Sequence, residues 1–490
     1  MNLSRLFSLI FFLALFALTS GCREKETSFT LSPVSDGNTP LVARGRLVTA
    51  RPSRVVAIHV ENGVDSELET NYATEHDVTI LGFKPGSHHE VRLDYQLEGE
   101  SEVHTSESRE MVTPPLPSGF PQIESRRFED GPEEGGFVLV SLVPQGPGSP
   151  LAQPGYLILC DTEGQVIWYH RLDRSPTDVR PDQEGFLTFQ TLSGLDTLKM
   201  DWTGSSVRRW VSTGLKKDEQ AGTPVDLETV HHDFWPLEDG SFWTLSSKRR
   251  EMNIDETIVR VAADGAVIKE ISLMDELDPG RELYPPHPNF WELFYGPGVV
   301  DWGHSNSLYL NSAGKEALVS LRHQDAVVNV DLESGRVKWI LGRPEGWNRE
   351  LRKRLLRGDG DLQWFAKQHA AKWTGEGKVM MFDNGRERSR AVEYQIDEEA
   401  GIVREAWSFQ DETPFYSEYF GDVDILPHTG NVQITDGARK DEKGHDWARV
   451  VEVTHDNPSR KVRELVFTRP GTKGCTIYRA ERLTSLYKTI

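Results

Sequence analysis

The chain has 490 residues, a hydrophobic fraction of 37%, an aromatic fraction of 9% and a formal net charge of −21. This length exceeds one ordinary compact core, so we expect two folded units or one large repeat architecture. The negative charge is spread along the sequence and basic clusters are short, which argues against nucleic acid as a partner.

The N-terminus has the pattern of an export signal. Arg5 precedes an apolar run, 6–18, and small residues lie between this run and Cys22. The run has 13 residues, fewer than the roughly 20 that span a bilayer, so a retained transmembrane anchor is the weaker alternative. The pattern resembles a bacterial lipoprotein box, in which Cys22 becomes the lipidated first residue of the mature protein.

We therefore expect residues 1–21 to be a lipoprotein signal peptide and 22–28 a tether. Arg23, directly after the cysteine, implies retention in the outer membrane. The expected location is the bacterial cell envelope, lipid-anchored in the outer membrane and facing the periplasm.

Two segments precede the main part of the chain. Residues 29–115 contain short alternating apolar runs separated by turn signals such as Lys84-Pro85-Gly86, which predicts a small N-terminal β-sandwich domain. From 116 to 135 the composition shifts to proline, glycine and charge. This shift indicates a linker, or a strap across the next domain.

From residue 136 onward one unit recurs: an apolar strand, a turn with an acidic residue, and a second strand that frequently carries tryptophan. The six copies span 159–168, 199–210, 259–271, 328–339, 394–407 and 451–466. Another pair of strand-like runs precedes each hairpin after the first. Repeated four-stranded units predict an all-β fold, with a six-bladed β-propeller over 136–490.

The last apolar run, 475–478, is expected to complete the first blade and close the ring. Closure would also bring Cys475 towards Cys160. An exported protein permits disulfides, so the sequence leaves a disulfide and two buried free thiols equally open.

Three histidines share one position in the repeat. His232 and His369 stand eight residues before a turn glycine, as do Thr177 and Asp422, and His304 fills the corresponding place in the remaining unit. A single strand histidine is more often structural than functional. Equivalent positions at the starts of innermost strands surround the channel of a propeller, so we expect the three histidines to converge there.

Other polar residues accompany them. Asn306 lies two residues after His304, which puts both side chains on one face of a strand, and Arg322 falls in 320–325, on the next strand of the same blade. Imidazoles, an amide and a guanidinium suit a tetrahedral oxyanion, because arginine presents a fixed donor fork and neutral imidazole can act as nucleophile or base.

Other kinds of site have less support. Three histidines could bind zinc, but an arginine in the same ring repels a divalent cation, so we expect no metal. The sequence has no Walker loop, nucleophile elbow or dinucleotide fingerprint, and we expect no cofactor.

Six short motifs resemble those of the bacterial arylsulfate sulfotransferases, in order and over essentially the whole mature sequence. They are His231-His232-Asp233-Phe234, Asp301-Trp302-Gly303-His304-Ser305-Asn306-Ser307, Arg322-His323-Gln324-Asp325-Ala326, Trp339-Ile340-Leu341-Gly342, Gln368-His369 and Phe382-Asp383-Asn384-Gly385. The resemblance implies a propeller after a small β-sandwich. It also implies ping-pong transfer of a sulfuryl group between phenols, without an adenylated sulfate nucleotide.

The resemblance implies residue roles as well. His369 matches the nucleophile, which becomes a transient sulfohistidine. His304, Asn306 and Arg322 match residues that hold the sulfuryl oxygens. One of the non-nucleophilic histidines would protonate the leaving phenoxide and deprotonate the incoming phenol.

Two positions are less settled. The pair His231-His232 matches a further active-site histidine; the blade register favours His232 as catalytic and leaves His231 as a substrate-binding candidate. The family often has an acidic residue after the nucleophile, where this chain has Ala370. Alternation along a strand would point this residue away from the channel.

The partners that the resemblance implies are a phenolic sulfate donor and a phenolic acceptor, and a homodimer stays open. Two other functions also remain: a propeller that binds sulfated or anionic ligands without turnover, and an envelope assembly scaffold. The aromatic segment 284–295 either walls an aryl-binding pocket or packs between blades.

Overall fold

The computed structural model describes residues 27–34, 37–128, 131–146, 153–182, 185–215, 221–360, 362–411 and 415–487. The expected signal peptide, Cys22 and most of the tether lie outside these residues. Within them, helical structure is limited to α1 (Glu292–Tyr295) and two 3-10 turns, η2 (Arg322–Gln324) and η3 (Leu351–Lys353). None of the helices in the described ranges is long and apolar enough to cross a membrane.

A strand-rich region comes first. Its strands are β1 (Ser28–Pro33), β2 (Ala43–Val60), β3 (Ser66–Glu67), β4 (Ala73–Ile80), β5 (His88–Leu97), β6 (Val103–Thr105) and β7 (Arg109–Val112). The first half of β2 lies between β1 and β4, and its second half pairs with β5. Buried apolar residues alternate with exposed ones along β2 and β5, so one face of each strand fills the core.

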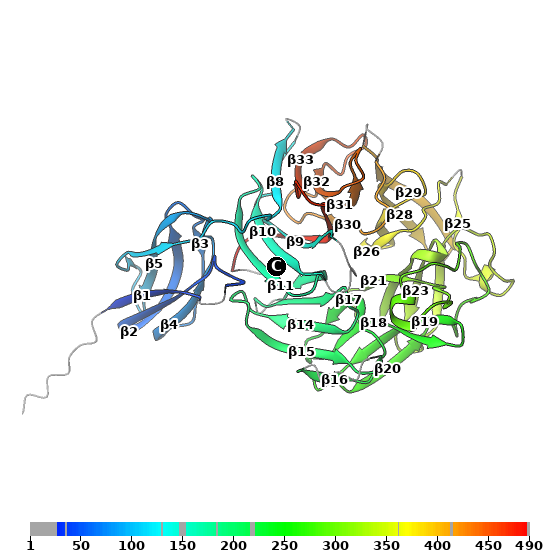
Figure 1. The fold of residues 1–490 in the computed structure, drawn as a ribbon, viewed down its shortest axis with the longest axis horizontal. Coiled ribbons are helices and arrows are strands. Elements are labelled where there is room, and N and C mark those ends of the chain that lie inside the picture. The colour runs from blue at the N-terminus through cyan, green and yellow to red at the C-terminus, as the bar shows by residue number, and fades with distance from the viewer. Residues whose placement is uncertain are drawn as a thin grey trace, which may run out of the picture.

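Six further sheets follow one another around a central channel (Figure 1). From the channel outward, blade one contains β34 (Cys475–Leu483), β9 (Phe137–Pro144), β10 (Gly155–Asp161) and β11 (Val166–Leu172). Blade two contains β12 (Pro176–Pro181), β13 (Leu187–Thr191), β14 (Asp196–Met200), β15 (Ser206–Ser212) and β16 (Thr223–Val225). Blade three contains β17 (His231–Pro236), β18 (Phe242–Arg250), β19 (Asn253–Val261) and β20 (Val267–Ser272).

Blade four contains β21 (Ser305–Leu310), β22 (Glu316–Leu321), β23 (Ala326–Asp331) and β24 (Val337–Gly342). Blade five contains β26 (His369–Gly375), β27 (Lys378–Asp383), β28 (Arg390–Asp397), β29 (Ile402–Phe409) and β25 (Arg357–Gly358). Blade six contains β30 (Asp422–Ile425), β31 (Val432–Lys440), β32 (Asp446–Val453), β33 (Lys461–Thr468) and β8 (Gln122–Arg127). The predicted all-β, six-bladed propeller is confirmed.

The predicted hairpins coincide with six consecutive outer strand pairs. These pairs are β10–β11, β14–β15, β19–β20, β23–β24, β28–β29 and β32–β33. The C-terminal strand β34 pairs with β9 and supplies the innermost strand of blade one. The expected closure of the ring is therefore confirmed.

Closure does not bring the two cysteines together. Cys475 lies opposite Pro144 at one end of β9, whereas Cys160 lies opposite Val138 at the other end. Six residues of strand separate these ends by roughly 20 Å, whereas a disulfide needs Cα atoms within about 7 Å. Both thiols are buried and free, so the disulfide alternative is wrong.

The segment expected as a linker or strap joins the two parts of the molecule. Its strand β8 pairs with β33 and becomes the outermost strand of blade six. Residues of the N-terminal strands and of blades one and six share one hydrophobic core. The N-terminal region is thus packed onto the propeller, on the left of Figure 1.

Candidate active site

The repeat position from which we predicted the site lies at the start of the innermost strand in blades two to six. Thr177, His232, His304, His369 and Asp422 each fall within one residue of the start of an innermost strand. The rings of His232 and His304 are 5.2 Å apart. Asn306, on β21, donates from Nδ2 to the carbonyl oxygen of Gln368 at 2.8 Å. The structure therefore brings the three blades that carry these histidines together.

The backbone at this end of the channel is strained. Of the eight residues other than glycine that have a left-handed φ in the described ranges, six lie here: His232, His304, Asp325, Lys367, Ala370 and Phe420. Each such residue costs on the order of 1 kcal/mol, and strain of this kind clusters at functional sites. The ladders are also irregular between Ser305 and Ser307 and between His369 and Lys372. Simple alternation therefore does not decide where Asn306 and Ala370 point.

His369, the first residue of β26, is held in one tautomer. Its side chain is buried, and Nδ1 lies 2.7 Å from Oδ1 of Asn384. The Asn384 amide has a fixed orientation, because Nδ2 donates to the carbonyl oxygens of Ser417 and Phe420, each at 2.9 Å. Rotating the amide by 180° would lose both hydrogen bonds. Nδ1 of His369 must then carry the hydrogen, and Nε2 keeps its lone pair. Burial, followed by the charge of Arg322, lowers the pKa of His369 well below its usual value.

Replacing Asn384 with leucine should lower kcat by about 10–100-fold, the usual cost of losing a partner that orients a functional histidine. Asn384→Asp should retain more activity, because a carboxylate still accepts the hydrogen bond from Nδ1 of His369. Steady-state kinetics and a melting curve of each variant give the comparison. A leucine variant as active as the wild type would contradict this role for Asn384.

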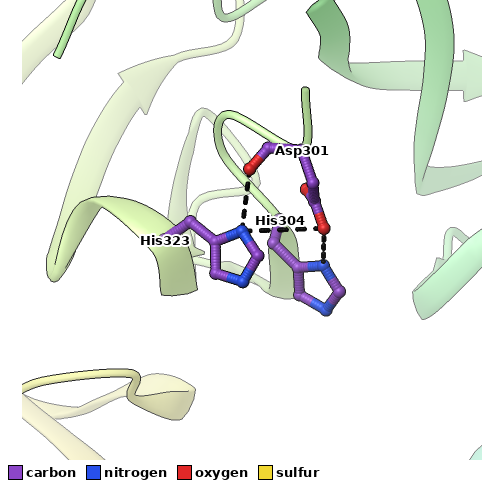
Figure 2. A group of neighbouring side chains, drawn as sticks. All are labelled: Asp301, His304 and His323. Atoms are coloured by element: carbon purple, nitrogen blue, oxygen red, sulfur yellow. Dashed lines mark hydrogen bonds and ion pairs between the residues drawn. The ribbon is translucent and has the colours of Figure 1, made fainter. Parts of the chain in front are cut away.

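His304 is oriented by a carboxylate instead (Figure 2). Its Nδ1 donates to Oδ2 of Asp301 at 2.7 Å, which leaves Nε2 on the far side of the ring. Asp301 is buried, and although burial alone would raise its pKa, the neighbouring His304 and His323 keep it lowered. A buried, ionised carboxylate stabilises an imidazolium on its partner, as general acid–base chemistry requires.

His323 completes this cluster. It stacks on His304 with ring centroids 4.8 Å apart. Its Nδ1 lies 2.8 Å from the carbonyl oxygen of Asp301, and its Nε2 lies 2.8 Å from a guanidinium nitrogen of Arg322. The arginine can only donate, so Nε2 accepts and Nδ1 carries the hydrogen. Burial lowers the pKa of His323 to about 4.

Ligand atoms of Asp301, His304 and His323 lie within 4.8 Å of one another, close enough to hold a metal ion. The hydrogen-bonding pattern argues for a different use. Nδ1 of His304 and both ring nitrogens of His323 already have protein partners, and one of these partners is the cation of Arg322. The cluster is therefore a hydrogen-bonded chain in which Arg322 donates to His323, and His323 and His304 both donate to Asp301.

His231 and His232 occupy different environments. His231 is 4% exposed and packs against Trp291, with ring centroids 4.9 Å apart. Burial lowers its pKa to about 3. His232 is less buried and faces His304 and Tyr478. The two Nδ1 atoms are 2.7 Å apart, so one ring donates to the other.

Buried Glu256 lies behind this pair. Its Oε2 is 3.6 Å from Nε2 of His231 and accepts from the hydroxyl of Ser305. Burial raises the pKa of Glu256 well above its usual value. One of the two Nδ1 atoms carries the shared hydrogen, so the tautomers of His231 and His232 are linked. When His231 is the donor, Nδ1 of His232 accepts and Nε2 of His232 carries a hydrogen.

Arg322 differs in position from the sequence expectation. It does not lie on the strand beside β21; it opens the 3-10 turn η2, directly after β22 ends at Leu321. The turn ends at Asp325, whose φ is 43°. Arg322 also donates to the carbonyl oxygen of Glu418 at 3.1 Å, which aims the guanidinium from blade four towards the segment before blade six.

The sequence left open whether the aromatic segment 284–295 walls the site or packs between blades, and its residues do both. Trp291 is fully buried with Ile254 and Val299, as a packing residue would be. Phe290 is only partly buried, and its ring centroid lies 6.4 Å from that of His304. The segment therefore packs through Trp291 and walls the site through Phe290.

Several residues at the site escaped the sequence analysis. Asp301 and Asn384 stood in motifs without a role. Tyr478 and Arg479 belong to the closing strand; the Arg479 guanidinium donates to the carbonyl oxygen of Asn306 and to Asp233, each at 3.1 Å. Only the closure of the ring lets a side chain of this strand reach β17 and β21, so no local signal could have found it.

Comparison with known proteins places the chain in a protein family. A model described as arylsulfotransferase (ASST) matches residues 129–479, most of the chain. The chain belongs to the arylsulfotransferase family. The matched range contains every site residue described above, from His231 to Arg479.

Two curated relatives bear the name arylsulfate sulfotransferase AssT. The one from Escherichia coli O6:H1 (strain CFT073) is 27% identical over 356 residues, which cover 63% of this chain and 56% of that protein. The one from Lelliottia amnigena is 23% identical over 397 residues, which cover 64% of this chain and 65% of that protein. The match to these arylsulfotransferases thus spans less than two thirds of their length.

Proposed function

We propose that this protein transfers a sulfuryl group from a phenolic sulfate ester to a phenolic acceptor, in two steps through a sulfohistidine at His369. The observation that carries the proposal is the Asn384 hydrogen bond, which leaves Nε2 of a neutral, buried His369 free to attack. The names of the two relatives support the same reaction class.

In the first step, Nε2 of His369 attacks sulfur, an N–S bond forms and the S–O bond to the aryl group breaks. The leaving phenoxide takes a proton from Nε2 of His304, whose imidazolium the Asp301 carboxylate stabilises. In the second step, the acceptor phenol returns a proton to His304, its oxygen attacks sulfur and the N–S bond breaks. Arg322 and His232 are the donors proposed for the sulfuryl oxygens, where charge develops.

Asn306 has a different part in this proposal. Its amide holds the backbone of Gln368, next to His369, while the Asn306 carbonyl oxygen Oδ1 has no partner in the described residues. Asn306 thus supports the position of the nucleophile. It remains a candidate for substrate binding through the rest of its amide.

Transfer from 4-nitrophenyl sulfate to phenol tests the proposal. The purified protein should release 4-nitrophenolate and form phenyl sulfate in equal amounts, with the parallel-line kinetics of a ping-pong reaction. Reversible binding of the donor without turnover would instead favour the anion-binding alternative. Release of inorganic sulfate independent of phenol would contradict transfer.

We also propose that Cys22 anchors the protein by lipidation in the outer membrane, facing the periplasm. The apolar run 6–18 and the small residues before Cys22 support this. Fractionation of cells that express the wild type or Cys22→Ser tests it. The wild type should sediment with membranes, and equal solubility of the two proteins would contradict the anchor.

A further inference from the structure

A group of cations surrounds Tyr284 beside the reaction centre. Lys367 and Arg386 lie over the Tyr284 ring, with 5.6 Å and 5.4 Å from the charged groups to the ring centroid. The Tyr284 hydroxyl donates to Asp325 at 2.6 Å. We call Tyr284, Lys367, Arg386 and the nearby Tyr416 the basic rim.

The buried carboxylate beside the basic rim, Asp325, already has several partners. Fully buried Asp325 accepts from the Tyr284 hydroxyl and from the backbone nitrogen of Lys367, and it pairs with Arg386 at 3.2 Å and Arg343 at 3.7 Å. One carboxylate therefore serves two guanidinium groups. The rim keeps excess positive charge, in a chain whose formal net charge is −21.

The ammonium group of Lys367 is the least satisfied cation. Its partners are the Tyr416 hydroxyl at 3.5 Å and the face of the Tyr284 ring. It makes no ion pair with any carboxylate in the described part of the chain; Glu418 is close enough to influence it electrostatically but is exposed. Burial and the neighbouring cations Arg322 and Arg386 lower the pKa of Lys367. A bound anion would relieve this repulsion.

The backbone of Lys367 is unusual as well. Its φ is 55°, a left-handed conformation that favours glycine. A lysine there costs on the order of 1 kcal/mol, and its ammonium group lies over the Tyr284 ring, two residues before His369 in the chain. Strain of this kind is a reason to look for a function of the side chain.

The basic rim is continuous with the reaction centre. The Tyr284 ring lies 5.8 Å from that of His323, which stacks on His304. Arg322 contacts the same histidine, with a guanidinium nitrogen 2.8 Å from Nε2 of His323. Through His323 and Arg322, the basic rim therefore adjoins the residues proposed to act on the sulfuryl group.

We propose that the basic rim is a second anion subsite, and that the preferred donors are phenolic sulfates whose ring carries another anionic group, such as a carboxylate or a second sulfate. The Lys367 ammonium and the Arg386 guanidinium bind that group, and the two tyrosines flank the ring. This inference rests on the proposed transferase function and names its substrate class.

The kinetic test compares 4-carboxyphenyl sulfate with phenyl sulfate. In the wild type, kcat/KM should favour the carboxylated donor, and Lys367→Met should reduce that preference by about tenfold, the effect of losing one partly buried charged contact. Arg386→Gln should reduce it less, because Arg386 is more exposed and shares Asp325. Raising the salt concentration should also weaken the preference.

Lys315→Met is the matched control, since it removes the same charge from an exposed turn after the innermost strand of blade four, at the end away from His304. It should leave the preference unchanged. An equal preference in the wild type, Lys315→Met and Lys367→Met would overturn the subsite.

A binding measurement separates this inference from the proposed reaction. Calorimetry should find tighter binding of 4-sulfobenzoate than of benzenesulfonate to the wild type, and equal binding of the two to Lys367→Met. Neither probe can transfer a sulfuryl group, so this result supports the subsite even if the transfer assay fails. Transfer activity without any difference between the two probes would reject the subsite and leave the proposed function intact.

Discussion

Replacing His369 with alanine should lower kcat/KM for sulfuryl transfer on the order of 10⁴-fold or more, because the covalent route disappears with its nucleophile. The loss should fall on both half-reactions, since each passes through the same N–S bond. In the proposed mechanism neither His304 nor His232 replaces it, because His304 is the proton donor and His232 binds a sulfuryl oxygen.

His445→Ala is the matched control for this variant. His445 is exposed on the turn between β31 and β32 and pairs with Asp441. It should keep full activity, and melting curves should show that both variants fold. Near-normal transfer by folded His369→Ala would remove the nucleophile from the mechanism.

Replacing His304 with glutamine should have the next largest effect, about 10²–10⁴-fold on kcat, the usual range for a general acid–base group. The loss should depend on the leaving group. Phenyl sulfate needs protonation of its phenoxide and should lose most, whereas 4-nitrophenyl sulfate, with its more stable phenoxide, should lose least.

His323→Gln tests whether the effect belongs to the dyad of His304 and Asp301. His323 stacks on His304, but its ring nitrogens bind the Asp301 backbone and Arg322. We expect a smaller loss that is similar for both donors. An equal loss for the two donors in His304→Gln would argue that His304 only holds the sulfuryl oxygens.

The sequence predicted the propeller because its hairpins repeat a local pattern. A strand, an acidic turn and a second strand, often with tryptophan, recur in each blade, and the ladders follow them. The repeat also located His232, His304 and His369, since one position in each blade faces one channel. Both predictions, the propeller and the three histidines, therefore rest on the repeat.

The features that the sequence did not predict depend on contacts that a repeating pattern does not specify. Arg322 lies on a turn that ends at Asp325, whose backbone is left-handed. Cys160 and Cys475 lie apart because each strand pairs with β9 in a register that places its cysteine at a different end of β9. Asn384 approaches His369 through a side-chain hydrogen bond between neighbouring strands of blade five. Each of these depends on where two chain segments meet.

The most direct test of the central claim is the intact mass of the protein after incubation with 4-nitrophenyl sulfate and no acceptor. We predict an acid-labile gain of one sulfuryl group, assigned to His369 by peptide mapping and discharged when phenol is added. His369→Ala should show no gain. A wild-type protein that turns over donor without any such adduct, or an adduct that persists in His369→Ala, would contradict the account.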